Sequence, residues 1–254
     1  MSEPYVHLSG VRKVYRKGSE EFLAISDASF DVMPGELVTL VGPSGCGKST
    51  LLKILAGLHP HDAGEVRIGS ATHAFDPARD VGMVFQAPLL LKWRRILENV
   101  LLPAEILGLP AAESRARAKD LLALVGLAGF EDKYPYELSG GMQQRAAIAR
   151  ALVHDPKLVL MDEPFGALDA LTREKMNLEL LRIWKESKKT ILFVTHGISE
   201  AVFLGNRVVV LTSGPARMAD NFEIRLPHPR TLDMKTHEAF GEYTRRIYRL
   251  LGME

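Results

Sequence analysis

The chain lacks several features that mark whole classes of protein. It has a single cysteine, Cys46, so no internal disulfide can form and a reducing compartment is expected. Uncharged runs such as Leu121 to Phe130 are far shorter than the ~20 apolar residues of a membrane-spanning helix. The N-terminus carries Glu3 and no apolar stretch, so no signal peptide is expected.

The chain also has no large excess of basic or of acidic residues. Lys and Arg together number 32 against 31 for Asp and Glu, so no global field directs the chain to nucleic acid or to anionic lipid. Hydrophobic residues make up 46% and charged residues 25%, which is average for soluble globular proteins and excludes a disordered chain. The 254 residues show no fixed-period repeat, so we expect one continuous fold.

Short apolar runs predict most of the strands. Val11–Tyr15 and Phe22–Phe30 are separated by residues 17–19, including Ser19, and predict an antiparallel hairpin. Leu37–Val41 is a strand before a Gly-rich loop, and a helix is expected from Ser49 to Leu58. Further runs are apolar on both faces, as in buried parallel strands. These are Val81–Phe85, Leu158–Met161, Ile191–Val194 and Val208–Leu211.

Helical periodicity appears in three other segments. Ala118, Leu121, Leu122 and Val125 follow the i, i+3, i+4, i+7 pattern and indicate an inserted helical subdomain. Residues 171–185 predict an amphipathic helix. A polar stretch around Pro227 and Pro229 leads to a final helix carrying Phe240, Tyr243, Ile247 and Leu250, which we expect to pack as a tail.

Residues 42–49 fit the phosphate-loop pattern of Gly, four residues, Gly, Lys, and Ser or Thr. Glycines let backbone amides surround a phosphate, and the following helix directs its positive N-terminus at the anion. Lys48 would reach the β and γ phosphates and Ser49 would ligate magnesium. The alternatives are a plain Gly-rich turn and, for Cys46, a small loop filler rather than a nucleophile. The expected nucleotide-binding residues here are Gly42, Pro43, Ser44, Gly45, Cys46, Gly47, Lys48, Ser49 and Thr50.

Two carboxylates, Asp162 and Glu163, follow the apolar run that begins at Leu158. Ligands bind at the C-terminal edge of a parallel sheet, and hard divalent ions prefer oxygen ligands. Asp162 therefore suits magnesium, directly or through water. Glu163, pointing the other way by strand alternation, would orient or deprotonate a water. The alternative is a solvated turn before Pro164.

A second Gly-rich helix start lies at Ser139, Gly140 and Gly141, ahead of an Ala-rich helix. It suits phosphate binding, although Ser139 alone would be read as an ordinary N-cap. One complete phosphate loop and a second, separate anion-binding helix end in one chain suggest a nucleotide site shared between chains.

In these blocks the sequence resembles the ATP-binding cassette (ABC) family along nearly its whole length. The resemblance rests on residues 42–49, 138–143, 162–163 and 167–169, with Gln86 and His196 at the family's glutamine and histidine positions. It implies an α/β fold of the P-loop NTPase (RecA-like) type, in which a parallel-sheet core carries an N-terminal antiparallel β-subdomain and an inserted α-helical subdomain. Residues 1–254 would form one ABC ATPase domain, with 1–91 and 155–225 as β-subdomain and core, 92–154 as helical subdomain and 226–254 as tail.

The resemblance also implies residue roles in a head-to-tail dimer that binds ATP and Mg²⁺. Glu163 would be the catalytic base, Gln86 would sense magnesium or the attacking water, and His196 would contact the γ phosphate. Tyr15 would stack on adenine, unless it is an ordinary strand aromatic, and a satisfied core histidine is the alternative for His196. Ser139, Gly140, Gly141 and Gln143 of one chain would face ATP held by the other, with Asp169 at the dimer interface. Metal ligands would be Ser49, Gln86 and Asp162.

Softer features resemble the nitrate, sulfonate, taurine and bicarbonate branch of bacterial importer ATPases. These are Leu89–Trp93, Asn99 and the short tail, with departures at Lys92 and Gly197. The branch implies an ATPase on the cytoplasmic side of the inner membrane, working as a homodimer or cassette heterodimer with membrane permease subunits and a solute-binding protein, and without nucleic acid. Residues 86–108 would lie near the groove for a permease helix. For Trp93, a place in the helical core is an equal alternative.

Three other functions remain open from the sequence. An exporter or lipid-trafficking cassette shares the same motifs, because the ATPase does not touch cargo. A soluble P-loop phosphotransferase would leave Ser139–Gly141 unexplained. A cassette acting on ribosomes or DNA resembles this chain less, since such relatives carry two cassettes or a long coiled coil, and this chain has one phosphate loop and no sustained heptads.

Overall fold

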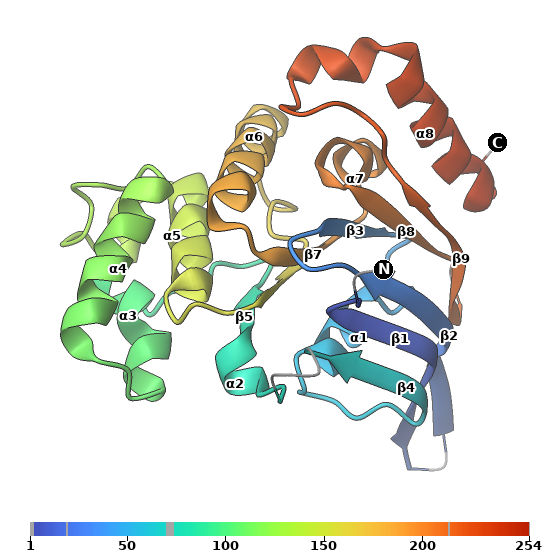
Figure 1. Ribbon diagram of the computed structural model, residues 1–254, viewed down its shortest axis with the longest axis horizontal. Helices are drawn as coiled ribbons and strands as arrows, with labels where there is room; N and C mark the ends of the chain where they lie inside the picture. Colours follow the sequence, from blue (N-terminus) through green and yellow to red (C-terminus); the bar gives the residue numbers. More distant parts are fainter. Residues whose placement is uncertain (1–2, 19, 70–73, 213, 254) are drawn as a thin grey trace. The chain divides into compact units, whose positions relative to one another are not determined.

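The computed structural model describes residues 3–18, 20–69, 74–212 and 214–253 (Figure 1). The chain divides into two compact units. The first unit is formed by Met1–Phe75 together with Thr190–Glu254, and the second by Asp76–Lys189. The segment that forms the second unit is therefore inserted between the two parts of the first.

The first unit begins with an antiparallel sheet. Strand β1 (Val6–Lys17) lies between β2 (Glu20–Val32) and β4 (Ala63–Ile68), with Tyr15 opposite Phe22. The predicted hairpin is thus confirmed, with longer strands than expected, while Ser19 lies outside the described residues. Strand β4 was not predicted, because its polar, largely exposed sequence has no apolar face to show a strand period.

Parallel pairs form most of the rest of this sheet, and β8 pairs with β9 in the antiparallel sense. Strand β3 (Leu37–Val41) runs between β7 (Thr190–Thr195) and β8 (Arg207–Thr212), and β9 (Ala216–Glu223) joins β8 to β2. Every residue of β3 and β7 is buried, which explains why both read as unbroken apolar runs. Helix α1 (Lys48–Leu55) covers one face of the sheet, and α7 (Ile198–Leu204) covers the other (Figure 1).

The C-terminal segment packs on the same side as α7. A short turn of 3₁₀ helix, η2 (Leu232–Thr236), precedes α8 (Glu238–Leu250), which buries Phe240 and Ile247. Before it, the buried guanidinium of Arg230 donates hydrogen bonds to the carbonyls of Val202, Phe203 and Gly205 at the end of α7. The last carbonyls of a helix have no partner within the helix, so Arg230 ties the tail to α7 by satisfying them.

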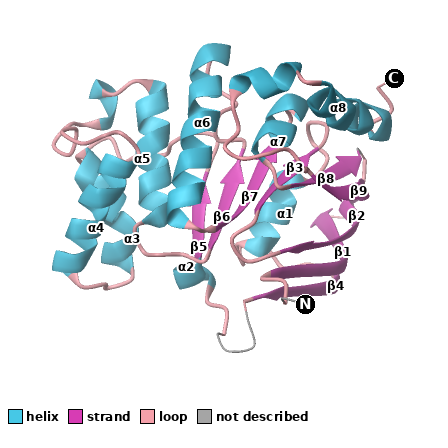
Figure 2. Ribbon diagram, turned by 45° about the horizontal axis from the view of Figure 1, so that its top comes forward, coloured by secondary structure: helices cyan, strands magenta, loops and turns pink. Residues whose placement is uncertain are grey.

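In the second unit, two parallel strands are covered by helices (Figure 2). Strand β5 (Val81–Val84) follows the short α2 (Pro77–Asp80) and pairs with β6 (Leu158–Asp162). Helices α3 (Ile96–Ile106), α4 (Ala111–Leu124) and α5 (Gly140–Leu152) pack on one another, and α5 also packs on β5. The 3₁₀ turn η1 (Pro135–Glu137) precedes α5, and α6 (Ala170–Ser187) follows β6. Helices α3 to α5 fall within the predicted range 92–154, whose role as a separate subdomain stays a prediction.

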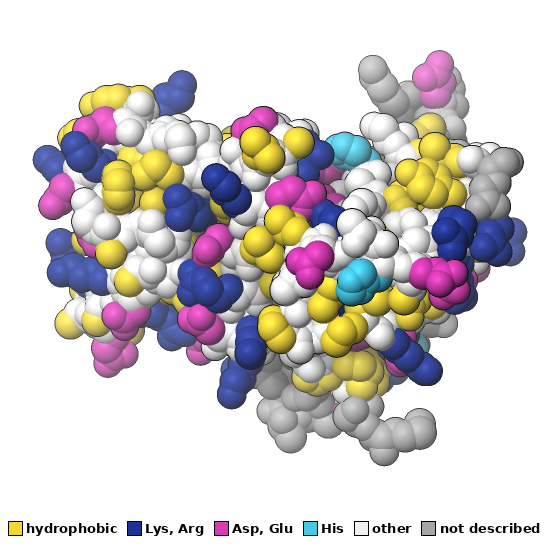
Figure 3. Space-filling view, turned by 90° about the horizontal axis from the view of Figure 1, so that it is seen from above, with side chains coloured by type: hydrophobic (Ala, Val, Ile, Leu, Met, Phe, Trp, Pro, Cys, Tyr) yellow, Lys and Arg dark blue, Asp and Glu magenta, His cyan; other side chains and the backbone are white. Residues whose placement is uncertain are grey.

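The α/β fold class with parallel and antiparallel strands is as predicted. Among the residues that the structure describes, no helix combines the length and the apolar character needed to cross a membrane. On the face in Figure 3, basic and acidic side chains are interspersed instead of gathering by sign. This agrees with the near balance of 32 basic and 31 acidic residues.

Candidate nucleotide-binding site

The phosphate loop joins β3 to α1, and its glycines are required by geometry. Gly47 is the N-cap of α1 with φ of 97°, a left-handed conformation that side chains disfavour, and it brings no side chain to cap the first turn. A Cβ atom at Gly47 would lie 2.9 Å from the carbonyl oxygen of Ala24, and one at Gly42 would lie 2.5 Å from that of Leu211. The loop therefore presents backbone, not side chains, to whatever binds at the helix start.

Lys48 lies within the curve of this loop. Its side chain is only 4% exposed, and Nζ donates hydrogen bonds to the carbonyls of Gly42 and Pro43 at 2.8 and 2.9 Å. Cys46 is buried with its Sγ 4.0 Å from the same Nζ, so it fills space beneath the loop. The ammonium is thus held close to the backbone amides that would surround an anion.

His196 lies at the same sheet edge as the phosphate loop. Strands β3 and β7 pair Val41 with Thr195, so Gly42 and His196 each follow directly on that pair. The hydroxyl of Thr195 accepts a hydrogen bond from the Gly197 amide at 2.9 Å and donates to Glu200, which fixes the turn. His196 is exposed, so the alternative of a core histidine is wrong.

Tyr15 lies within β1, which continues to Lys17, two residues beyond the predicted end of this strand. Its half-buried ring has the His59 ring edge-on at 5.9 Å between centroids and the Lys13 ammonium 5.5 Å from its centre. Its hydroxyl is 3.5 Å from the hydroxyl of Thr50 in the first turn of α1. An aromatic face therefore lies close to the start of the helix.

Asp162 and Glu163 occupy the corresponding edge in the second unit. β6 ends at Asp162, and Glu163 has φ of 46° and accepts a hydrogen bond from Gly166, so it begins a turn. Strand alternation therefore does not set the direction of Glu163, contrary to the prediction. A Cβ at Gly166 would lie 3.2 Å from Nε2 of Gln86, so the turn after Glu163 and Gln86 are close together.

The second Gly-rich helix start also has the expected form. Ser139 is the N-cap of α5, and its hydroxyl accepts a hydrogen bond from Met142 at 3.4 Å. Ser139 and Gly140 are exposed, and a Cβ at Gly141 would lie 3.2 Å from the Thr172 methyl group. Gln143 holds the preceding turn by donating to the carbonyls of residues 135 and 138. Ser139 therefore caps α5 while the start of the helix stays exposed.

Asp169 caps α6. Its carboxylate accepts a hydrogen bond from Thr172 at 3.0 Å, and this interaction holds the pKa of Asp169 below its usual range. Arg173 in the first turns of α6 donates to the carbonyls of Phe165 and Leu168. The loop from Glu163 to Asp169 is therefore tied to α6.

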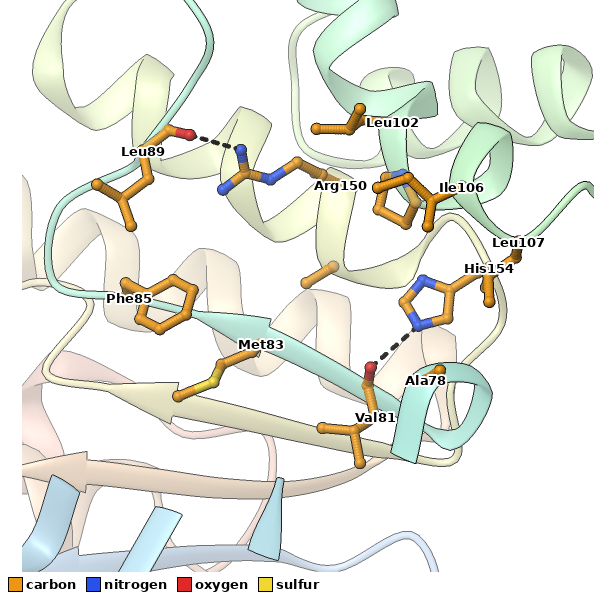
Figure 4. Close-up of a pocket in the computed structure, with 12 residues that line it drawn as sticks. Ala78, Val81, Met83, Phe85, Leu89, Leu102, Ile106, Leu107, Arg150 and His154 are labelled. Carbon is orange, nitrogen blue, oxygen red and sulfur yellow. Dashed lines mark hydrogen bonds between the residues drawn. The ribbon is translucent and has the colours of Figure 1, made fainter. Parts of the chain in front are cut away.

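A pocket of about 470 Å³ lies between β5 and helices α3 and α5 (Figure 4). Leu89 and Ile106 on its wall are 58% and 75% exposed. Trp93 does not line the pocket and is 75% exposed, so the helical-core interpretation of Trp93 is wrong. Sequence reasoning did not single out the polar residues on this wall, because neither Arg150 nor His154 belongs to a motif. The residues lining the pocket are Ala78, Val81, Met83, Phe85, Leu89, Leu102, Pro103, Ile106, Leu107, Arg150, Ala151 and His154.

The candidate residues fall on both units, and the structure brings them together within each. The phosphate loop, Tyr15 and His196 belong to the first unit, and Gln86, Asp162, Glu163, Ser139 and Asp169 to the second. Among the described residues, no three His, Cys, Asp or Glu side chains form a metal cluster. Magnesium held with a nucleotide needs only one or two carboxylates, since phosphate and water supply the other ligands.

Comparison with known proteins agrees with this geometry. Residues 25–166 match the ABC transporter family. An uncharacterized ABC transporter ATP-binding protein of Methanocaldococcus jannaschii is 46% identical over 97% of this chain and 91% of its own length. An aliphatic sulfonates import ATP-binding protein of Bacillus cereus is 42% identical over 95% and 94%. A taurine import ATP-binding protein of Roseobacter denitrificans is 43% identical over 90% and 86%.

Solved structures give the same result. A dimeric bacterial ABC transporter cassette matches with a TM-score of 0.72 and 35% identity, over 87% of this chain and all of that chain. A second structure of a dimeric cassette, in a post-hydrolysis state with ADP and phosphate, matches equally well.

Proposed function

The chain belongs to the ABC transporter family of ATP hydrolases, and we propose that it is the ATP-binding subunit of an importer, driving a membrane permease. Two copies, or this chain and a related cassette, would close around two ATP molecules and open again after hydrolysis. ATP would favour the closed pair because it binds that state more tightly than the open one. The phosphate loop with its buried Lys48 supports nucleotide binding.

The proposed nucleotide contacts follow from the local geometry. The loop of residues 42–50 would hold the phosphates, and Tyr15 would stack on adenine. His196 would contact the γ phosphate, since it lies beside the loop at the same strand edge. From the other chain, Ser139, Gly140, Gly141 and Gln143 would present the exposed start of α5 to the nucleotide.

The donor set also fits magnesium, which would neutralise phosphate charge. Ser49, in the first turn of α1, supplies a hydroxyl, Asp162 a carboxylate at a strand end, and Gln86 an amide oxygen. All three are hard oxygen donors. Glu163 would accept a proton from the attacking water, and Asp169, held ionised at the start of α6, would lie at the dimer interface.

The apolar pocket of the second unit is the observation that supports a permease partner. Its wall exposes Leu89 and Ile106, and Phe85 and Leu89 on that wall flank Gln86 in the sequence. Exposed apolar groups around a concave site mark a surface that binds a partner. A permease helix placed there would contact the same segment that supplies a residue to the nucleotide site, which is the link that coupled transport needs.

The relatives suggest which molecule is transported. Relatives that are 42% and 43% identical over most of this chain are import ATP-binding proteins for aliphatic sulfonates and for taurine. We therefore favour a small anion such as an aliphatic sulfonate, taurine, nitrate or bicarbonate. The ATPase would work at the cytoplasmic side of the inner membrane with a separate solute-binding protein.

Affinity purification tests this function. The chain, tagged and carrying Glu163→Gln to retain ATP, would be purified from native membranes in mild detergent, and co-purifying proteins identified by mass spectrometry. A multi-spanning permease is the expected result. Recovery of no membrane protein, with ATP binding retained, would contradict the transport function and favour a soluble ATPase or phosphotransferase. A permease found with a lipid-export system would correct the direction of transport.

Two surface substitutions sharpen the test. Ile106→Glu places a charge on the pocket wall, and Tyr136→Glu places one at an equally exposed apolar position of the same unit that does not line the pocket. The two positions are 75% and 72% exposed, so neither change disturbs a core. Permease recovery should fall at least tenfold with Ile106→Glu and stay within twofold with Tyr136→Glu. Equal recovery would show that the pocket is not the docking site.

A further inference from the structure

The segment from Phe85 to Leu89 is fastened to helix α5 at both ends. Nε2 of Gln144 donates a hydrogen bond to the Phe85 carbonyl at 3.0 Å. The two terminal nitrogens of Arg150 donate to the carbonyls of Pro88 and Leu89, each at 2.7 Å. Figure 4 shows the bond to Leu89. One planar guanidinium therefore holds two consecutive peptide groups, a geometry that a lysine ammonium cannot reproduce.

The segment has a conformation that requires such support. Leu89 has φ of 48°, in the left-handed region that residues with a side chain rarely adopt. Its side chain is 58% exposed, so packing does not hold it in place. Strained backbone persists only where surrounding groups determine it, and here the Arg150 hydrogen bonds do so.

Arg150 is not explained by charge pairing. Among the residues that the structure describes, no carboxylate lies within ion-pair distance of it, and burial lowers its pKa. Arg150 is half-buried, and backbone carbonyls, not an acid, satisfy its two terminal nitrogens. It also forms part of the pocket wall, together with Phe85 and Leu89. The two carbonyl hydrogen bonds of Arg150, which form the Arg150 clamp, therefore lie at the wall of the pocket.

Gln86 lies within the segment from Phe85 to Leu89, which Gln144 and Arg150 hold against α5. Its Nε2 is 3.2 Å from the Cβ position of Gly166, in the turn that Glu163 begins. A shift of Phe85 or Leu89 along α5 would move Gln86 relative to that turn. Helix α5 also starts at Ser139 and Gly140, so one rigid element connects the clamp to the second helix start of the site.

We propose that Arg150 is a positioning residue, which holds the segment from Phe85 to Leu89 and so sets Gln86 for ATP hydrolysis. The inference rests on the proposed function for the part that Gln86 plays in hydrolysis. The positioning of Gln86 by Arg150 requires only this chain, ATP and Mg²⁺.

A double-mutant cycle tests the positioning role. Gln86→Ala, Arg150→Met and the combined variant would be compared for kcat of ATP hydrolysis and for ATP affinity without Mg²⁺, in the complex recovered through the same tag from chains that keep Glu163. If no membrane protein is recovered, the proposed function fails and the same cycle is measured on the purified chain. We expect each single change to lower kcat at least tenfold, ATP affinity to stay within twofold, and the combined variant to be no slower than Gln86→Ala.

A neighbouring arginine supplies the matched control. Arg145, on the same helix, also donates to two consecutive carbonyls, those of Val125 and Gly126, but it does not line the pocket. The effects of Arg145→Met and Gln86→Ala on kcat should multiply. If the effects of Arg150→Met and Gln86→Ala on kcat also multiply, Arg150 acts independently of Gln86 and the inference is overturned.

Hydrogen exchange separates positioning from folding. Amide exchange across residues 86–95 should accelerate at least fivefold in Arg150→Met and less in Arg150→Lys, with the rest of α5 unchanged. Should Arg150→Met fail to fold, Arg150→Lys carries the cycle, since it keeps the charge and loses the two-carbonyl contact. A loosened segment in either variant with kcat within twofold of the parent would contradict the proposal.

Discussion

Single residues of the phosphate loop have conformations that only glycine tolerates. Gly47 and Gly10 both have positive φ, 97° and 60°, but a Cβ at Gly10 would meet nothing within 4 Å. The left-handed conformation costs a residue with a side chain about 1–2 kcal/mol. Gly47 additionally has a φ beyond the left-handed range that other residues adopt, and its Cβ would lie 2.9 Å from the Ala24 carbonyl oxygen.

Gly47→Ala should therefore be more destabilising than Gly10→Ala. We expect about 1–2 kcal/mol for Gly10→Ala, and roughly 1–3 kcal/mol beyond that for Gly47→Ala because the backbone must shift. Urea unfolding of both variants measures the difference. Equal losses in the free energy of unfolding would mean that the β2 backbone moves away from the added methyl group at no cost.

The pH dependence of stability should include a contribution from His154. Its Nε2 lies 3.1 Å from the Val81 carbonyl, and burial holds the pKa of its imidazole below the usual 6.5, with Arg117 and Lys189 adding to the effect. The unfolded chain binds a proton at pH values where the folded chain does not. Stability is therefore present above about pH 6.5 and is lost as the pH falls towards the lowered pKa.

His154→Gln should flatten that pH dependence. The free energy of unfolding, measured with urea from pH 7.5 to 5, should fall less steeply in the variant than in the parent. His59→Gln is the control, because this half-buried histidine belongs to the other unit and has none of the contacts that surround His154. A parent curve with the same slope as the His154→Gln curve would show that His154 does not titrate differently in the two states.

At the scale of elements, Asn99 organises the loop ahead of α3. It is fully buried, and its amide nitrogen donates to the carbonyls of Leu91, Arg94 and Arg95. Its oxygen accepts a hydrogen bond from the Leu91 amide at 2.7 Å. One side chain thus satisfies four backbone groups in a segment that has no regular structure of its own.

Asn99→Asp should destabilise the chain by roughly 3 kcal/mol or more. The carboxylate keeps the shape and the Leu91 contact, but it faces three carbonyl oxygens to which it cannot donate, and it is buried. Asn99→Ala, which leaves the carbonyls unsatisfied without adding charge, should lose somewhat less. Urea unfolding measures the free energy of unfolding of both variants. If Asn99→Asp is more stable than Asn99→Ala, water or a proton enters the site.

Elements with a strong apolar period were predictable and the others were not. β3, β7 and β8 read as strands because both of their faces are buried. β9 has only alternating partial burial and several polar residues, and α7 is short and almost wholly buried, so it has no polar face to reveal a helical period. The motifs located the candidate site, because glycine and lysine at fixed spacing reflect local backbone geometry. The Arg150 clamp joins segments about 60 residues apart, and no sequence period reports such a contact.

For the whole molecule, the exposed start of α5 is the feature that a single chain does not explain. It lies on the unit that does not carry the phosphate loop, and the matched cassette structures are dimeric. Surface charge does not oppose association, since the formal net charge is +1. Pairing of two chains around nucleotide would give both helix starts an anion to bind.

Glu163→Gln should therefore form an ATP-dependent dimer. The substitution removes the proposed proton acceptor and keeps the phosphate contacts, so ATP stays bound and holds the closed pair. Light scattering at saturating ATP and Mg²⁺ should give twice the mass of the 28.1 kDa chain, and removal of ATP should restore the monomer. Adding Lys48→Ala should prevent pairing by weakening the hold on phosphate. A Glu163→Gln chain that binds ATP but stays monomeric would contradict the shared-site arrangement.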